Sequence, residues 1–279
     1  MKNLRGGVAV VTGAGSGIGR GMALAFAEAG MKVVVVDIDA AGADAVCEEV
    51  KGLGVTALAQ EVDVVERGAL EALAERVYAE FGATHVLCNN AGVTTFKLMC
   101  GDLSDEDWSW VLAVNLQGVI NGLQAFLPRM REQEGEKHVV NTSSIAGVAP
   151  GPLNAPYTAT KHAMVGISST LRIEGVQFGI GCSVLCPANV ATRITDSERN
   201  RQQSFGGPRP DTNPVIAAHV AEGLDPLLVG RMVRQAILDD IPFIFTHPPV
   251  TRSIVETRHD SMLESIDWAE AWLGEGGSG

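Results

Sequence analysis

A phenol and an amine stand four residues apart at Tyr157 and Lys161. On a helix, residues at this spacing lie on one face, one turn apart, and Pro156 just before them is typical of a first helical turn. An ammonium beside a phenol stabilises the phenolate, so we expect the pKa of Tyr157 to fall from about 10 toward neutrality. Such a tyrosine can take a proton from an alcohol or give one to a carbonyl. Such a pair alone is more often structural, and its position after the fifth predicted strand is what indicates catalysis.

Two serines follow the apolar run that begins at His138. Ligands of open α/β sheets bind at the carboxyl ends of the strands, where Ser143 and Ser144 would lie. One of these hydroxyls is therefore a candidate for holding the reacting oxygen. The alternative is a serine that only satisfies the loop backbone.

A glycine-rich turn at Gly13, Gly17 and Gly19 separates the first apolar run from a helical pattern. Glycines let the backbone turn tightly and approach a pyrophosphate, and the following helix offers free N–H groups and the positive end of its dipole. By itself the turn could be only a tight loop. Asp37 strengthens the interpretation, because it ends the next apolar run at roughly the 20-residue distance expected of a ribose-binding carboxylate.

Asp37 also indicates which dinucleotide binds. Its carboxylate can accept both hydroxyls of the adenosine ribose and would repel a 2′-phosphate, and neither Ser16 nor Ile38 is basic. The sequence therefore favours NAD over NADP. The alternative is a solvated aspartate at a strand end.

The elements that must position these residues alternate along the first two thirds of the chain. Apolar runs are followed by helical patterns, which predicts parallel strands joined by crossover helices and covered on both faces. The fold class we predict is α/β: a doubly wound, Rossmann-type parallel sheet of about seven strands with helices on both faces. Strands are expected at 8–11, 32–36, 56–64, 85–88, 138–141, 181–185 and 242–246, and helices at 22–29, 41–52, 68–81, 108–127, 156–175 and 229–239.

We expect a single dinucleotide-binding and catalytic domain over residues 1–273. Within it, residues 193–228 are polar and rich in proline and glycine, which predicts a substrate lid. Residues 274–279 are rich in glycine and predict a flexible tail.

Composition argues against several classes of function. The 279 residues carry a formal net charge of −12, which opposes binding to nucleic acid or anionic lipid. The five cysteines form no Cys-x-x-Cys pair and the six histidines are scattered, so we expect free thiols and no metal site. No apolar run approaches the ~20 residues of a spanning helix. The N-terminus has no signal-peptide pattern, so a cytoplasmic protein is the expectation.

Together the motifs resemble the short-chain dehydrogenase/reductase family, in its compact single-domain branch of the Tyr-x-x-x-Lys type. The resemblance covers about residues 5–195, in the family's order and spacing. The family usually has a glycine where this chain has Ala188, whose methyl restricts the backbone beside the nicotinamide pocket. The motifs are Thr12-Gly13-x-x-x-Gly17-x-Gly19, Asp63, Asn89-Asn90-Ala91-Gly92, Asn115, Ser144, Tyr157-x-x-x-Lys161, and Pro187 with Val190 and Thr192.

The resemblance implies a role for each catalytic residue. Tyr157 is expected to be the general acid/base, and Ser144 to hold the substrate oxygen. Lys161 is expected to bind the nicotinamide ribose, lower the Tyr157 pKa and relay protons, and Asn115 to distort its helix and hold a water of the relay. The cofactor-binding residues it implies are Gly13, Ser16, Gly17, Ile18, Gly19, Asp37, Ile38, Asp63, Val64, Asn90, Ala91, Gly92, Tyr157, Lys161, Pro187, Val190 and Thr192.

The function expected is that of an NAD-dependent oxidoreductase, which interconverts a secondary alcohol and its ketone by hydride transfer. The segment Phe243–Pro248 resembles family members that act on bulky aryl alcohols, including lignin-derived ones, and NAD preference leans toward alcohol oxidation. A steroid, terpenoid or acyl ketone is the alternative substrate, and a non-catalytic NAD-binding scaffold is the alternative function. A bulky, partly apolar substrate is also suggested by residues in and near the lid, namely Leu153, Asn154, Phe205, Val215, Ile216 and Leu224.

Two further expectations follow from the resemblance. Extended relatives that act on nucleotide sugars carry a Gly-x-x-Gly-x-x-Gly turn, which differs from the turn in this chain. The chain is also expected to form a homodimer or homotetramer through the helices at 108–127 and 156–175. Its other partner would be a small-molecule alcohol or ketone, with no nucleic acid or membrane.

Overall fold

The computed structural model describes residues 1–95, 98–209 and 214–274. It divides into two units, Met1–Thr246 and the segment that begins at His247. The first unit holds the sheet, and the second holds α9 (Pro248–Gly274), in which only Thr251 is buried. The predicted single domain over 1–273 spans both units and remains a prediction. Within the predicted tail, residues 275–279 lie outside the described residues.

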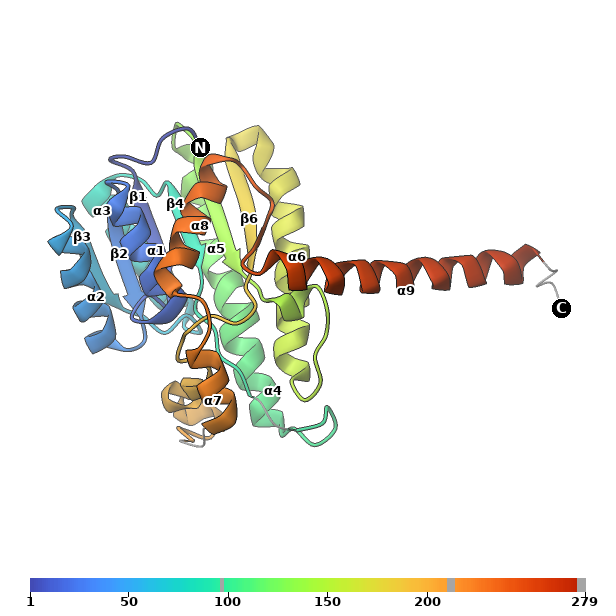
Figure 1. The fold of residues 1–279 in the computed structure, drawn as a ribbon. Coiled ribbons are helices and arrows are strands. Elements are labelled where there is room, and N and C mark those ends of the chain that lie inside the picture. The colour runs from blue at the N-terminus through green and yellow to red at the C-terminus, as the bar shows by residue number, and fades with distance from the viewer. Residues whose placement is uncertain (96–97, 210–213, 275–279) are drawn as a thin grey trace. The chain divides into compact units, whose positions relative to one another are not determined.

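Seven parallel strands form one sheet in the order β3-β2-β1-β4-β5-β6-β7 (Figure 1), which confirms the predicted fold class. The central strands are buried along their whole length, as expected of parallel strands covered on both faces. Strand order reverses between β1 and β4, and ligands bind at such switch points. The strands are β1 (Val8–Thr12), β2 (Lys32–Asp37), β3 (Ala57–Glu61), β4 (Val86–Asn89), β5 (Lys137–Thr142), β6 (Ile180–Cys186) and β7 (Phe243–Phe245).

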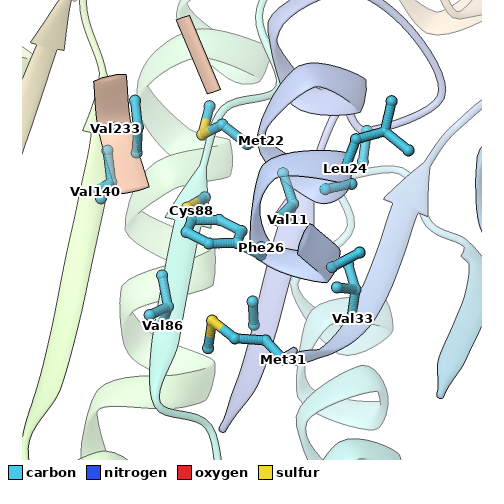
Figure 2. Packing of buried hydrophobic residues seen from close by; sticks show 14 of the residues in the cluster. Val11, Met22, Leu24, Phe26, Met31, Val33, Val86, Cys88, Val140 and Val233 are labelled. Atoms are coloured by element: carbon cyan, nitrogen blue, oxygen red, sulfur yellow. The ribbon is translucent and has the colours of Figure 1, made fainter. Parts of the chain in front are cut away.

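Helices cover both faces of the sheet, and each face has its own apolar core. On one face, Phe26 of α1 and Val233 of α8 belong to one buried cluster with Val140 of β5 (Figure 2). On the other face, Trp110 of α4 and Phe126 of α5 belong to a second cluster. The helices of this unit are α1 (Gly17–Glu28), α2 (Ala40–Gly52), α3 (Arg67–Phe81), α4 (Asp105–Leu112), α5 (Gly118–Glu132), α6 (Ala155–Gly175), α7 (Pro214–Ala221) and α8 (Pro226–Leu238).

The helix predicted over 108–127 is interrupted in the structure. Between α4 and α5 the backbone forms a π-helical turn, Ala113–Gln117, of a kind that often occurs at functional sites. The combined stretch Asp105–Glu132 is, among the described helices, the one long and apolar enough to cross a membrane. Because 56% of its apolar window is buried inside the structure, it has the burial of a core helix.

The predicted lid is more regular than its sequence suggests. It begins with two 3-10 segments, Ile194–Asn200 and Gln203–Phe205, and continues into α7. Arg201 between them is fully buried, where its Nη1 lies 2.6 Å from Asp107 Oδ1 and its guanidinium carbon 5.0 Å from the Trp110 ring centroid. A buried ion pair of this kind is costly to break, so it fixes the start of the lid to α4.

Helices α1 and α8 meet backbone to backbone at Gly21 and Gly230. A Cβ atom on Gly230 would overlap the carbonyl oxygen of Gly21. We therefore expect Gly230→Ala to lower the free energy of unfolding by about 1–3 kcal/mol, since the helices must separate. Gly68→Ala on α3 is the matched control, because nothing lies within 4 Å of the added methyl. Gly68→Ala should raise the free energy of unfolding by about 0.5–1 kcal/mol. Urea unfolding measures both, and equal effects would contradict the contact.

Candidate active site

A cavity of about 430 Å³ lies at the carboxyl ends of β1, β2, β4, β5 and β6. Its wall is formed by the loops that follow these strands, by the start of α6 and by the first part of the lid. The predicted catalytic side chains Ser144, Tyr157 and Lys161 line it together with the glycine-rich turn. The structure therefore brings both sets of residues to one edge of the sheet.

Helix α6 positions the tyrosine and the lysine. Pro156 lies in its first turn, and Tyr157 and Lys161 follow on one face, with Lys161 Nζ 5.2 Å from the Tyr157 ring centroid. Lys161 Nζ donates to the carbonyl of Thr142 at 2.9 Å, and the carbonyl of Lys161 accepts from Ser143 Oγ at 2.7 Å. These two bonds tie the reactive turn of α6 to the end of β5.

Burial dominates the protonation of both groups. Loss of water lowers the pKa of Lys161 from 10.5 to about 8, so the amine remains mostly protonated at neutral pH. Burial also raises the pKa of Tyr157, and the hydrogen bond from Ser144 offsets only part of this rise. The predicted fall of the Tyr157 pKa toward neutrality is therefore wrong, because desolvation of the phenolate outweighs the hydrogen bond from Ser144.

Ser144 combines the two roles that the sequence left open. It caps the 3-10 turn Ile145–Gly147, where its Oγ accepts from the N–H of Ala146 at 3.2 Å, and it also reaches Tyr157 from the pocket wall. Ser143 is committed to the carbonyl of Lys161. Ser144 is thus the serine available to a reacting oxygen.

Asn115 lies in the π-helical turn and is buried behind the pocket wall. Its Oδ1 accepts from Val93 N at 2.8 Å, and its Nδ2 donates to Val93 O at 2.9 Å and to Thr160 Oγ1 at 3.3 Å. The side chain therefore holds the loop after β4 against α6. The predicted distortion of its helix is present, and its role in holding a water remains a prediction.

The glycine-rich turn has the geometry of a phosphate cradle. Gly13 and Gly17 adopt positive φ angles of 63° and 53°, and a Cβ on Gly13 would lie 2.7 Å from Ala91 Cα. Ser16 begins α1 without a side-chain cap, so the backbone N–H groups of the first turn stay open toward the pocket. Gly19 does not line the pocket, and its missing side chain lets the turn pack against Asn90.

Two carboxylates line the adenosine end. Asp37 is oriented by the turn itself, since its Oδ2 accepts from Gly15 N at 2.8 Å. Asp63 Oδ2 accepts from Gln202 Nε2 at 2.7 Å, and Gln202 Oε1 in turn accepts from Trp110 Nε1 at 3.0 Å. The lid thus contacts the predicted adenine site. The other predicted cofactor residues that line the cavity are Ile18, Ile38, Val64, Asn90, Ala91, Gly92, Pro187, Val190 and Thr192.

These features together fit a dinucleotide. The cradle allows close approach of phosphates, the helix N-terminus favours negative charge, and the strand-end Asp37 matches a ribose diol. Ala188 fits as well, because its φ is not positive and its N–H donates to Thr246 Oγ1 at 3.1 Å. The alanine at this position therefore adds no backbone strain.

Sequence reasoning missed the lid residues that face the cavity. These belong to the 3-10 segment and its flanks, and the available signal was only their position after Thr192. Leu153 is 48% exposed and, like the predicted apolar lid residues, does not line the cavity, whereas Asn154 does. The lid residues in the wall are Arg193, Ile194, Ser197, Arg199, Asn200, Gln202 and Val220.

Comparisons with known proteins agree with this geometry. A family model described as short chain dehydrogenase matches residues 7–203. The C alpha-dehydrogenase of Sphingobium sp. is 34% identical over 271 residues, which cover 95% of this chain and 88% of that protein. A short-chain dehydrogenase/reductase from Burkholderia phymatum, crystallised with NAD, is 35% identical with a TM-score of 0.87, covering 95% of this chain and 97% of that one. The apo form of LigD from Sphingobium sp. is 31% identical with a TM-score of 0.80, covering 94% and 98%.

The lowered pKa of Lys161 predicts a pH-dependent cost in stability. Between pH 8 and 10.5 the unfolded chain binds more protons at this residue than the folded one, so stability rises with pH across that window. Lys161→Met removes the titration. The free energy of unfolding of wild type then gains a rise with pH that the variant lacks. The free energy of unfolding of Lys161→Met minus that of wild type should therefore fall by on the order of 1–3 kcal/mol between pH 8 and 10.5. Urea unfolding at a series of pH values measures this. Lys51→Met, at an exposed lysine of α2, keeps Lys161, so its stability should rise with pH in parallel with wild type. Parallel profiles for wild type and Lys161→Met would contradict a Lys161 pKa near 8.

Proposed function

Because the chain belongs to the short-chain dehydrogenase/reductase family of oxidoreductases, we propose that it interconverts a secondary alcohol and its ketone with NAD. The observation that carries the proposal is the meeting of Ser144, Tyr157 and Lys161 in the cavity that also contains the glycine cradle. A hydroxyl, a phenol and an ammonium then face one reacting centre. A non-catalytic scaffold would have no need of all three.

Each residue has a distinct part in this reaction. Ser144 and Tyr157 hold the substrate oxygen between two hydroxyls, and Tyr157 exchanges the proton with it. The bound nicotinamide supplies or accepts the hydride. Lys161 places a positive charge beside the tyrosine, and an ammonium in this position favours the phenolate. Asn115 keeps the loop after β4 in register with α6.

The preference for NAD rests on Asp37. Its carboxylate lines the adenosine end, and Ile38 beside it offers no positive charge to a 2′-phosphate. The solved relative with bound NAD supports this choice of cofactor.

The substrate we propose is bulky and partly apolar, with an aryl alcohol as the leading class. The wall of the cavity that Tyr157 lines also contains Ile145, Pro152 and Ile194 together with polar Asn154. Apolar walls with a few polar groups are typical of sites for molecules of this kind. The similarity to the C alpha-dehydrogenase of Sphingobium sp. supports the same class.

The same proposal includes the assembly and the location of the protein. We propose a homodimer or homotetramer formed through α4, α5 and α6, and a cytoplasmic location. Ile173 of α6 is 78% exposed and Leu112 of α4 is 37% exposed, so both offer apolar surface to a second copy. Four of the five cysteines are buried and all five are free, which suits a reducing compartment. Light scattering coupled to size exclusion tests the assembly.

We expect Tyr157→Phe to lower turnover by about 10²–10⁴-fold, because the proton donor and acceptor is lost. Affinity for NADH should change less than twofold. Turnover is followed by nicotinamide absorbance with a panel of aryl and acyl ketones and alcohols. The other tyrosine, Tyr78, bonds Gln133 away from the cavity, so Tyr78→Phe is the matched control and should stay active. Near-normal turnover in Tyr157→Phe would refute the assignment.

Asp37→Asn should shift cofactor choice. Removing the negative charge lessens repulsion of a 2′-phosphate, so we expect the ratio of kcat/KM for NADP to that for NAD to rise about tenfold. Asp39→Asn removes the same charge two residues later but keeps the cap of α2, and Asp39 does not line the cavity. It should leave the ratio near its original value. An unchanged ratio in Asp37→Asn would show that this carboxylate does not select the cofactor.

A further inference from the structure

Two arginines from the lid face the glycine cradle. Arg193 and Arg199 line the cavity together with Ser16, Gly17 and Thr192. Apart from Lys161 at the catalytic end, they are the basic side chains in the wall formed by the described residues. The family motifs end at Thr192, so neither arginine was assigned a role by them.

Arg199 is only partly satisfied by its surroundings. Its side chain is 22% exposed, and its Nη1 donates to the carbonyl of Asp196 at 2.8 Å. Its Nε is buried and has no hydrogen-bond partner within the described part of the chain. Burial and the nearby Arg193 lower the pKa of Arg199. An unpaired buried donor on a charged group is costly, so an anionic acceptor in the cavity would relieve it.

The two arginines share one carboxylate. Arg193 Nη2 lies 2.7 Å from Asp196 Oδ2, and Arg199 Nη1 lies 3.6 Å from the same oxygen. Asp37 and Asp39 also lie near Arg199, since the charge of each carboxylate acts to raise its pKa. The first turn of α1, on the same cavity, adds the positive end of its dipole.

The other charges of the protein oppose an anionic ligand. The chain carries a net charge of −12, and Asp37 and Asp63 also line the cavity, so a ligand with two negative phosphates meets a repulsive field. The guanidinium groups of Arg193 and Arg199, which line the cavity, offset part of that field. A pyrophosphate, with oxygens on both sides, can bind backbone N–H groups of the cradle and guanidinium groups of the lid at once.

We propose that Arg199, assisted by Arg193, binds the pyrophosphate of the dinucleotide from the lid, opposite the glycine cradle. The inference rests on one part of the proposed function, namely that the cavity binds a dinucleotide. Binding replaces Asp196 as the partner of the two guanidinium groups. The ligand feature recognised is the diphosphate, which NAD, NADP and ADP-ribose share.

The test measures affinity rather than turnover. NADH is titrated by its fluorescence, and ADP-ribose and adenosine by displacement of bound NADH. Arg199→Gln should weaken NADH and ADP-ribose about tenfold or more while leaving adenosine within twofold, and Arg199→Lys should recover part of the loss. Arg209→Gln is the control, because Arg209 belongs to the same lid, pairs with Asp107 and does not line the cavity. Its affinities should match wild type.

Asp196→Asn provides a second variant with the opposite sign. Removing the carboxylate that competes for both arginines should tighten NADH and ADP-ribose several-fold, whereas loss of a purely structural aspartate would not. The proposal is overturned if Arg199→Gln weakens adenosine as much as ADP-ribose, leaves ADP-ribose unchanged, or affects NADPH alone. In each of those cases wild-type binding of NADH still supports the dinucleotide site. A wild-type protein that binds neither NADH nor ADP-ribose would instead overturn the proposed function.

Discussion

The parallel pairing of β1 with β4 is the constraint on which the rest of the site depends. Val11 pairs with Cys88, so the loops after the two strands leave the sheet side by side. Thr12 then joins these loops, because its Oγ1 accepts from Asn90 N at 2.9 Å and from Ala91 N at 3.1 Å. The glycine cradle is thereby held against the loop that leads to Asn115 and α6.

Polar bonds beneath the cavity extend this constraint to the catalytic groups. Asn89 Nδ2 donates to Asn141 Oδ1 at 2.9 Å, and Asn141 Nδ2 donates to Ser168 Oγ of α6 at 3.0 Å. Together with the bond from Lys161 to Thr142, they fix α6 against β5 and β4. Buried polar networks that are fully satisfied hold one arrangement, and here that arrangement sets the distance between the cradle and Tyr157.

The sequence predicts those parts of the structure that depend on local pattern. Uniformly apolar runs such as 8–11 and 33–36 predict parallel strands covered on both faces. Asp37 and Ser144 are candidates because they follow such runs, at the ends of strands. Three features depend instead on tertiary contacts. The π-helical turn around Asn115 requires the loop after β4 as a partner, and the pKa of Tyr157 is set by how much water the fold removes. Arg199 faces the cavity only because Arg201 is anchored on α4.

The anchored lid links the two ends of the cavity. Gln202 bonds Asp63 at the predicted adenosine end, and Ser197 Oγ accepts from Thr94 N at 3.1 Å, in the loop after β4. Ile194 and Ser197 lie in the same short 3-10 segment and also form the wall. One stretch of about ten residues, kinked at Asp196, therefore contributes to the surfaces that we propose meet both cofactor and substrate. The ion pair between Arg201 and Asp107 lies at the end of this stretch, outside both surfaces. A movement of the stretch therefore changes both surfaces together.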